Sequence, residues 1–164
     1  MSVRTQCWFR HIRTILIGGI LLAALDVAFA AFTMTETVTP SLGLVLSGAS
    51  GRNFILNTDG TVTGADAIDY VSGAVSGQLA LVKTQGPAQV NIVAENIVSS
   101  GGLTVNAIPC RYRNRPQTTC DGGGINARVR GTLTLHLGVD ITTSQVHNSG
   151  DMASVTFDIN VIFL

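Results

Sequence analysis

Charged residues, cysteines and aromatic residues are scarce in this chain of 164 residues. Only 12% of the residues are charged, and ten basic residues balance ten acidic ones, so the chain lacks the basic surface that nucleic-acid binding requires. A zinc site needs three or four clustered ligands, and the few histidines and cysteines show no such spacing. No nucleophile, phosphate-binding or dinucleotide-binding motif occurs, so the sequence predicts no enzyme, no cofactor and no metal site.

The first thirty residues differ in kind from the rest of the chain. A basic stretch precedes the apolar run from Ile15 to Leu25, and Ala28 and Ala30 give the A-x-A form of a signal cleavage site. A membrane-spanning helix needs about 20 apolar residues, whereas Asp26 ends this run early. A cleaved bacterial signal peptide over residues 1–30 is therefore favoured over a membrane anchor, and we expect an exported protein in the periplasm or at the cell surface.

The remaining residues, 31–164, are predicted to form one domain, because domains commonly run from roughly 100 to 200 residues. Two cysteines remain, Cys110 and Cys120, since Cys7 falls within the expected signal peptide. An even pair of cysteines in an exported chain predicts a disulfide bond, which forms in an oxidising compartment.

Alternation of apolar and polar residues is the main secondary-structure signal, and it is clearest from Ile125 to Leu137. The C-terminus repeats it with Val155, Phe157, Ile159, Val161 and Phe163. A tight turn is predicted at Thr58-Asp59-Gly60. Further candidate strands lie at 41–46, 53–57, 61–63, 78–82, 90–95 and 103–107. We expect an all-β, antiparallel sandwich of about eight short strands, with a barrel as the alternative.

Several short segments follow one another in an order shared with a group of bacterial exported domains. They are residues 57–64, 90–93, 103–105 and 129–135, the turn Ser149-Gly150-Asp151 and the final alternating strand. In this order the chain resembles the domains grouped as domain of unknown function 4402, over nearly all of residues 31–164. The resemblance implies an immunoglobulin-like sandwich and implies no reaction.

The final strand is also similar to that of chaperone-assembled fimbrial subunits, the pilins. These offer an alternating apolar C-terminal strand and receive a neighbour's N-terminal segment as a donor strand, because an unpaired strand edge invites pairing with another chain. In the present chain Phe32, Met34 and Val38 are the candidate N-terminal pairing residues, and Glu36 interrupts their apolar row. The resemblance implies pairing with copies of the chain or with other surface subunits, and a periplasmic chaperone as a candidate partner.

The loop between the two cysteines is rich in arginine. Arg111, Arg113 and Arg115 lie within five positions, beside Tyr112. If this segment is extended, the three side chains point to one side and can contact an anion or an acidic glycan. The alternative interpretation is a solvated surface loop held by the disulfide, which is the commoner role of such clusters.

These features together predict a non-enzymatic, exported structural or adhesion subunit of fimbria-like character. The alternative is a monomeric secreted binding module that contacts a glycan or another anion through the arginine loop. A hydrolase that gathers distant residues around His136 or His147 is a further alternative. Asp59, Asp66 and Asp69 are interpreted as turn-forming, solvated acids and not as calcium ligands.

Overall fold

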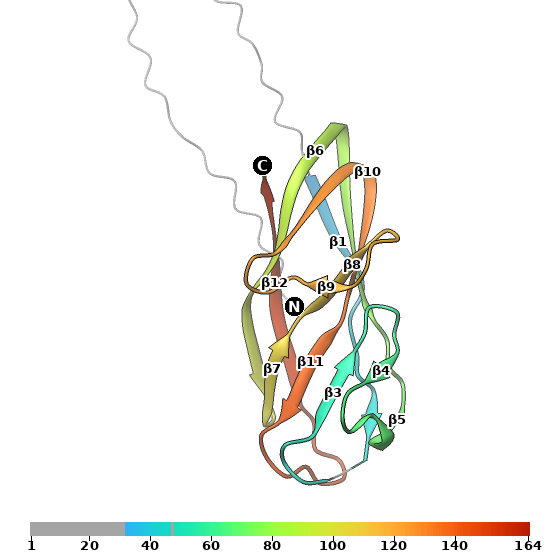
Figure 1. Cartoon of the computed structure of the whole chain (residues 1–164), viewed down its shortest axis with the longest axis vertical. Helices are drawn as coiled ribbons and strands as arrows, with labels where there is room; N and C mark the ends of the chain where they lie inside the picture. Colours follow the sequence, from blue (N-terminus) through green and yellow to red (C-terminus); the bar gives the residue numbers. More distant parts are fainter. Residues whose placement is uncertain (1–31, 47) are drawn as a thin grey trace, which may run out of the picture.

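The computed structural model describes residues 32–46 and 48–164 (Figure 1). The expected signal segment, with Ala28 and Ala30, lies outside the described residues. The strands, in chain order, are β1 (Phe32–Val38), β2 (Leu44–Val45), β3 (Asn53–Leu56), β4 (Val62–Thr63), β5 (Tyr70–Ser72), β6 (Gly77–Ser100), β7 (Leu103–Ala107), β8 (Pro109–Tyr112), β9 (Thr118–Thr119), β10 (Ile125–Leu137), β11 (Val139–Thr143) and β12 (Ser154–Phe163). One short 3-10 helix, Ala67–Asp69, precedes β5. The prediction of an all-β fold is confirmed. Within the two described stretches, no helix is long and apolar enough to cross a membrane.

The two longest strands, β6 and β10, both bend at the upper end of the molecule (Figure 1). β6 runs for 24 residues and bends near Gly86, whose φ of 60° lies in the left-handed region that glycine tolerates. β10 has Gly131 at its bend, with a φ of 70°. The register of the β6–β10 pairing shifts at this point. The strands expected at 78–82 and 90–95 are therefore the two arms of one bent strand.

Two main sheets share one apolar core. The larger has the order β1-β6-β10-β8-β9, with β12 paired to β6 as well, and the smaller has the order β4-β3-β11-β7. β2 and β5 form a separate small pair. All of these strand pairs are antiparallel, as predicted, and the arrangement is sandwich-like. The described residues form twelve strands where the sequence predicted about eight, because short strands such as β5, β8, β9 and β11 were not among those predicted.

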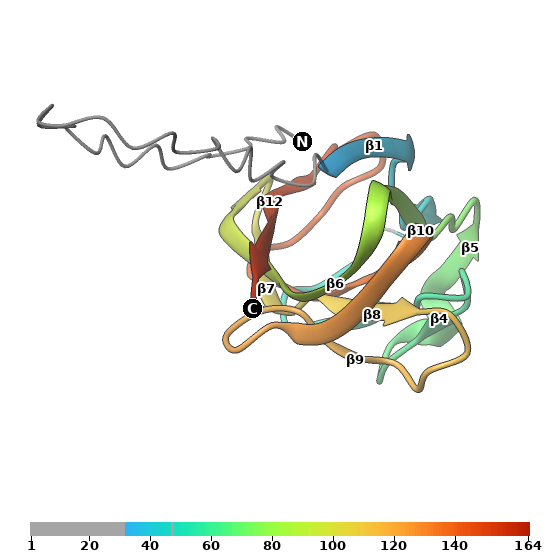
Figure 2. The ribbon, with the colours of Figure 1, turned by 90° about the horizontal axis from the view of Figure 1, so that it is seen from above.

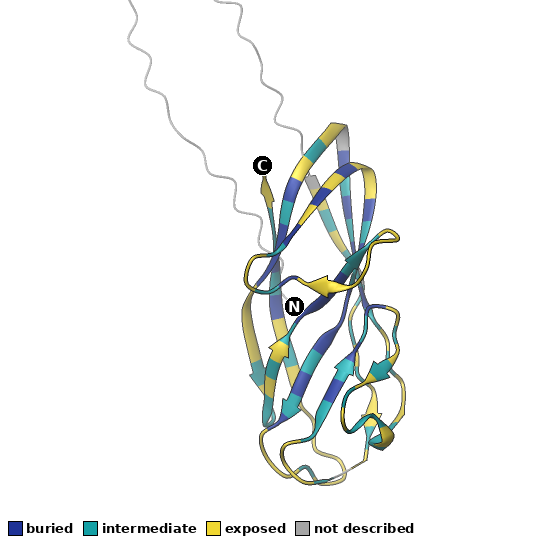
Figure 3. Ribbon diagram, in the orientation of Figure 1, coloured by how far each residue is buried: buried dark blue, intermediate teal, exposed yellow. Residues whose placement is uncertain are grey.

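The predicted alternation along β10 is confirmed: buried and exposed residues follow one another over most of its length (Figure 3). Leu133, Leu135 and Leu137 are at most 1% exposed and pack in the core. In β12, Phe157 and Ile159 are 3% and 0% exposed. Burying a side chain of this size contributes about 1.5 to 3 kcal/mol, so these two strands supply much of the stability of the core.

The predicted disulfide between Cys110 and Cys120 is confirmed. Both cysteines are fully buried, and their Cα atoms are 5.8 Å apart. Cys120 donates its backbone N–H to the carbonyl of Ile108, at 2.9 Å, and the N–H of Ala94 in β6 bonds to the carbonyl of Cys120, at 2.8 Å. The disulfide therefore joins β8 to a segment that is itself bonded to β6.

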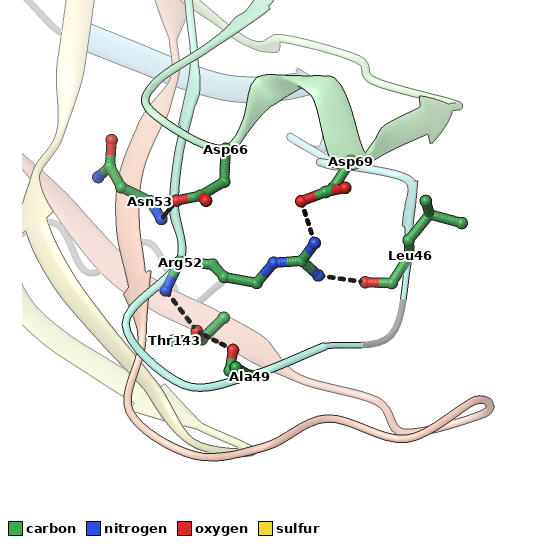
Figure 4. A network of polar contacts seen from close by, with 7 residues as sticks. All are labelled: Leu46, Ala49, Arg52, Asn53, Asp66, Asp69 and Thr143. Carbon is green, nitrogen blue, oxygen red and sulfur yellow. Dashed lines mark hydrogen bonds and ion pairs between the residues drawn. The ribbon is translucent and has the colours of Figure 1, made fainter.

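A network of polar contacts around Arg52 ties together the loops at the lower end (Figure 4). The guanidinium forms an ion pair with Asp69 and donates to the carbonyl of Leu46, at 2.8 Å. The backbone N–H of Arg52 donates to Oγ1 of Thr143 in β11, at 3.0 Å. Both charged side chains are mostly buried, with 17% and 24% exposed, so the pair is partly shielded from water.

The other two aspartates of the predicted turns also accept hydrogen bonds locally. Asp66 accepts the backbone N–H of Asn53, at 2.7 Å. Asp59 accepts both the hydroxyl and the N–H of Thr61, at 2.6 and 2.9 Å, and this hydroxyl bond is the main cause that lowers the pKa of Asp59. The turn at 58–60 is formed as predicted, with Gly60 at a φ of 85°.

Removing the disulfide with the double substitution Cys110→Ala and Cys120→Ala should lower the free energy of unfolding by about 2 to 3 kcal/mol, because the unfolded chain regains loop entropy. Urea denaturation of the oxidised wild type and of the double variant measures the difference. A difference below about 0.5 kcal/mol would contradict a stabilising role for the bridge.

Replacing Arg52 with methionine should lower the free energy of unfolding by about 1 to 2 kcal/mol, because Asp69 and the Leu46 carbonyl both lose a partly buried charged donor. Arg128→Met is the matched control, since Arg128 is exposed on β10. Equal stability of the two variants in urea denaturation would show that the Arg52 network does not hold the lower loops.

Candidate functional site

An apolar groove with a volume of about 830 Å³ opens in the lower half of the molecule. One wall is formed by residues 39–46 with Gly48 and Ala49, and the other contains the loop before β12 and the first residues of β12. Core side chains from both sheets contribute to the lining: Phe54, Leu103, Val139, Ile141 and Phe157. Phe54 and Phe157 are nevertheless 1% and 3% exposed, so the groove reaches down to the packed core.

The strands that border this groove have edges without a ladder partner. β2 pairs with β5, and β12 pairs with β6. Within residues 32–46 and 48–164, no backbone hydrogen bond joins β12 to the wall from Thr39 to Ala49. β1 likewise pairs with β6 alone. The N–H and C=O groups on the outer edges of these strands can therefore accept another strand.

The two edge strands β1 and β12 run in opposite directions. Each is antiparallel to β6, but β1 pairs with the arm from Gln78 to Lys83 and β12 pairs with the arm from Val90 to Ser100. Because β6 reverses at its bend, its two arms carry β1 and β12 on different sides of the molecule (Figure 2). A strand placed between β1 and β12 would be antiparallel to one of them and parallel to the other.

Three buried side-chain atoms have no hydrogen-bond partner in the described part of the chain: Oε1 of Glu36, Nε2 of His147 and Nε of Arg111. Glu36 lies in β1 opposite Leu79, a fully buried core residue, so its side chain is on the inner face. His147 lines the groove, and its backbone pairs with Gly48. Buried polar atoms in proteins are nearly always hydrogen-bonded, so each of these atoms requires an explanation.

The predicted strand-pairing residues fall into two groups. Phe32, Met34 and Val38 lie in β1, which already pairs with β6 of the same chain. The C-terminal residues lie in β12, where Val155 and Phe157 line the groove. Further along β12 Ile159 is fully buried, Val161 is half-buried and Phe163 is 54% exposed. Both groups therefore lie in strands that are paired to β6 along one edge and have no ladder partner along the other among the described residues.

The arginine loop is not extended. A turn reverses the chain after Tyr112, where the N–H of Arg115 donates to the Tyr112 carbonyl at 3.2 Å and Arg113 has a φ of 52°. The three arginine side chains would point to one side only if this segment were extended, and it is not. Arg113 and Arg115 are exposed, and Arg111 is half-buried in β8. A hollow of about 420 Å³ is lined by Arg111, Tyr112 and Arg115 together with the neighbouring loop.

The base of this loop is tied to the turn between β3 and β4. Gln117 accepts the N–H and the hydroxyl of Thr58, both at 2.9 Å, and donates to Asn57 at 3.0 Å. Arg111 lies beside the same turn, with Nη2 at 3.5 Å from the Thr58 carbonyl. Burial lowers the pKa of His136, and the charge of Arg111 on the neighbouring strand lowers it further. His136 is therefore neutral at neutral pH and adds no charge to the arginine loop.

The sequence predicted that β12 pairs with another chain, which stays a prediction, and it gave no indication of the groove. One wall, residues 39–46 with Gly48 and Ala49, includes part of the strand expected at 41–46, but nothing in the sequence places it opposite residues 147–153. The glutamate within the apolar row of β1 was the one available signal, because an inner-face carboxylate marks a site where the core is open or a partner is supplied.

Comparison with protein-family models, with curated proteins and with solved structures finds no match to this chain. The groove, the unpaired edges and the arginine loop are therefore the basis on which its function is inferred.

Proposed function

We propose that this protein is an exported, non-enzymatic structural or adhesion subunit of fimbria-like character, which joins other chains by strand pairing. The observation that carries the proposal is the apolar groove bordered by strand edges. A strand seated there would bury alternate side chains against Phe54, Ile141 and Phe157. Its backbone would bond to the edges of β2 and β12. Strand addition of this kind gains affinity from the main chain and specificity from the side-chain pockets.

An extended peptide fits this groove better than a small apolar ligand does. A small ligand would fill the apolar floor but would leave the backbone groups at both edges to water, whereas a strand satisfies both. The sandwich-like pair of sheets also supports an immunoglobulin-like architecture, in which the groove is the position of a further strand.

Export across a bacterial membrane is supported by two features. The first thirty residues have the composition of a signal peptide, with an apolar run followed by Ala28 and Ala30. The disulfide between Cys110 and Cys120 requires an oxidising compartment to form. Both are consistent with a protein that acts in the periplasm or at the cell surface.

A second candidate function is a binding module that contacts an anion or an acidic glycan. The observation that favours it is the hollow of about 420 Å³ lined by Arg111 and Arg115. Arg113 is exposed in the turn between Tyr112 and Arg115, both of which line the hollow. Loss of glycan or anion binding in the double variant Arg113→Ala, Arg115→Ala would favour this function over strand pairing.

The strand-pairing proposal is tested with a labelled peptide of about ten residues, the length of the wall from Thr39 to Ala49, with valine and threonine in alternation. We expect it to bind the oxidised protein of residues 31–164 in fluorescence anisotropy. Val155→Arg, which places a charge in the groove, should weaken binding by about tenfold or more. Leu42→Arg should do the same from the opposite wall.

Ile162→Arg is the matched control, because Ile162 is 51% exposed on the same strand and does not line the groove. Thermal unfolding of all variants shows whether each is folded. Absence of binding to the wild type, or binding that both groove variants leave unchanged, would overturn the proposal.

A further inference from the structure

We infer that the groove selects a segment of a different protein chain, one that carries a lysine or arginine at the position where it meets Glu36. The inference rests on the proposed function, since it specifies which segment the groove takes. The observation that carries it is the unpartnered carboxylate oxygen of Glu36 on the inner face of β1.

Glu36 lies next to the groove along the chain. It precedes Thr39, the first residue of the groove wall, by three positions, which is about 10 Å in an extended chain. Its neighbour on the same face, Met34, packs against the core, and Leu79 across the ladder is fully buried. A strand that continues from the groove along the free edge of β1 would therefore pass the Glu36 carboxylate.

Nothing in the described part of the chain neutralises this carboxylate. The one ion pair among the described residues joins Arg52 to Asp69 at the lower end. Lys83, on the same arm of β6, is opposite Phe32 at the other end of β1, and its Nζ lies 5.9 Å from the centre of the Phe163 ring. A buried carboxylate oxygen without a donor is unfavourable, so a donor from the inserted segment would relieve a cost that the free protein bears.

The same carboxylate disfavours a second copy of β1 as the occupant. A copy of β1 would bring its own Glu36 into the apolar row that must face the groove, where Arg52 of the lining is already paired with Asp69. Like charges brought together in a desolvated site repel, which is a common device for rejecting wrong partners. The Glu36 carboxylate, beside the groove on β1, therefore favours a different chain with a basic residue over self-assembly through β1.

The test uses the valine–threonine peptide with a single lysine placed at each inward-facing position in turn, and a parallel set with glutamate. Binding is measured to the wild type, to Glu36→Gln and to the control Glu95→Gln, which removes the charge of an exposed residue on β6 whose carboxylate, unlike that of Glu36, accepts a hydrogen bond, from Asn160. We expect one lysine peptide to bind the wild type and Glu95→Gln about tenfold more tightly than its glutamate counterpart. In Glu36→Gln the difference should largely disappear.

The outcomes separate this inference from the proposed function. Equal binding of lysine and glutamate peptides at every position, or a lysine preference that persists in Glu36→Gln, would overturn the inference while leaving the groove as a strand site. Absence of binding by every peptide, the uncharged one included, would overturn both. A peptide of residues 32–38 that binds as tightly as the best lysine peptide would identify a second copy as the occupant and would also overturn the inference.

Discussion

The pairing of β6 with three other strands determines how the rest of this molecule is arranged. β10 pairs with both arms of β6, while β1 and β12 each take the opposite edge of one arm. Because β6 bends near Gly86, the two edge strands are carried to different sides of one core and are not paired with each other. The groove follows from this geometry, since its walls continue from β1 on one side and into β12 on the other.

The loops at the two ends of the sandwich are fixed by side chains and not by further sheet. At the lower end Arg52 joins the wall of the groove to the 3-10 helix through Asp69 and to β11 through Thr143. Higher up, Gln117 joins the disulfide loop to the turn between β3 and β4. These contacts hold the groove and the arginine loop in place on separate parts of the surface, so the two proposed functions would use different sites.

Period-two alternation predicted those parts of the fold in which one face is buried and the other meets water. β10 satisfies that condition over most of its length, and in β12 Phe157 and Ile159 are buried as predicted, whereas Phe163 of the same row is exposed. The disulfide followed from two cysteines in a chain predicted to be exported. The bend of β6 was not predicted, because Gly86-Pro87 has the composition of a loop between two strands. The short strands β5, β8, β9 and β11 are set by tertiary pairing, which local sequence does not encode.

Only part of the candidate site could be predicted, because local sequence does not show which segments meet in three dimensions. The pairing character of β12 can be inferred from its own residues, but the opposite wall depends on where the chain after β1 lies in three dimensions. Glu36 was noticed as an interruption of an apolar row, yet only the ladder with β6 shows that its carboxylate is on the inner face, opposite Leu79.

Amide hydrogen exchange of β12, followed residue by residue by NMR in the free protein, tests the central claim that one edge of this strand is vacant. The account predicts alternation along β12: amides that bond to β6 exchange slowly, and the amides between them, which face the groove, exchange rapidly. Uniformly slow exchange along the strand would show that the edge is already covered, and would contradict the account.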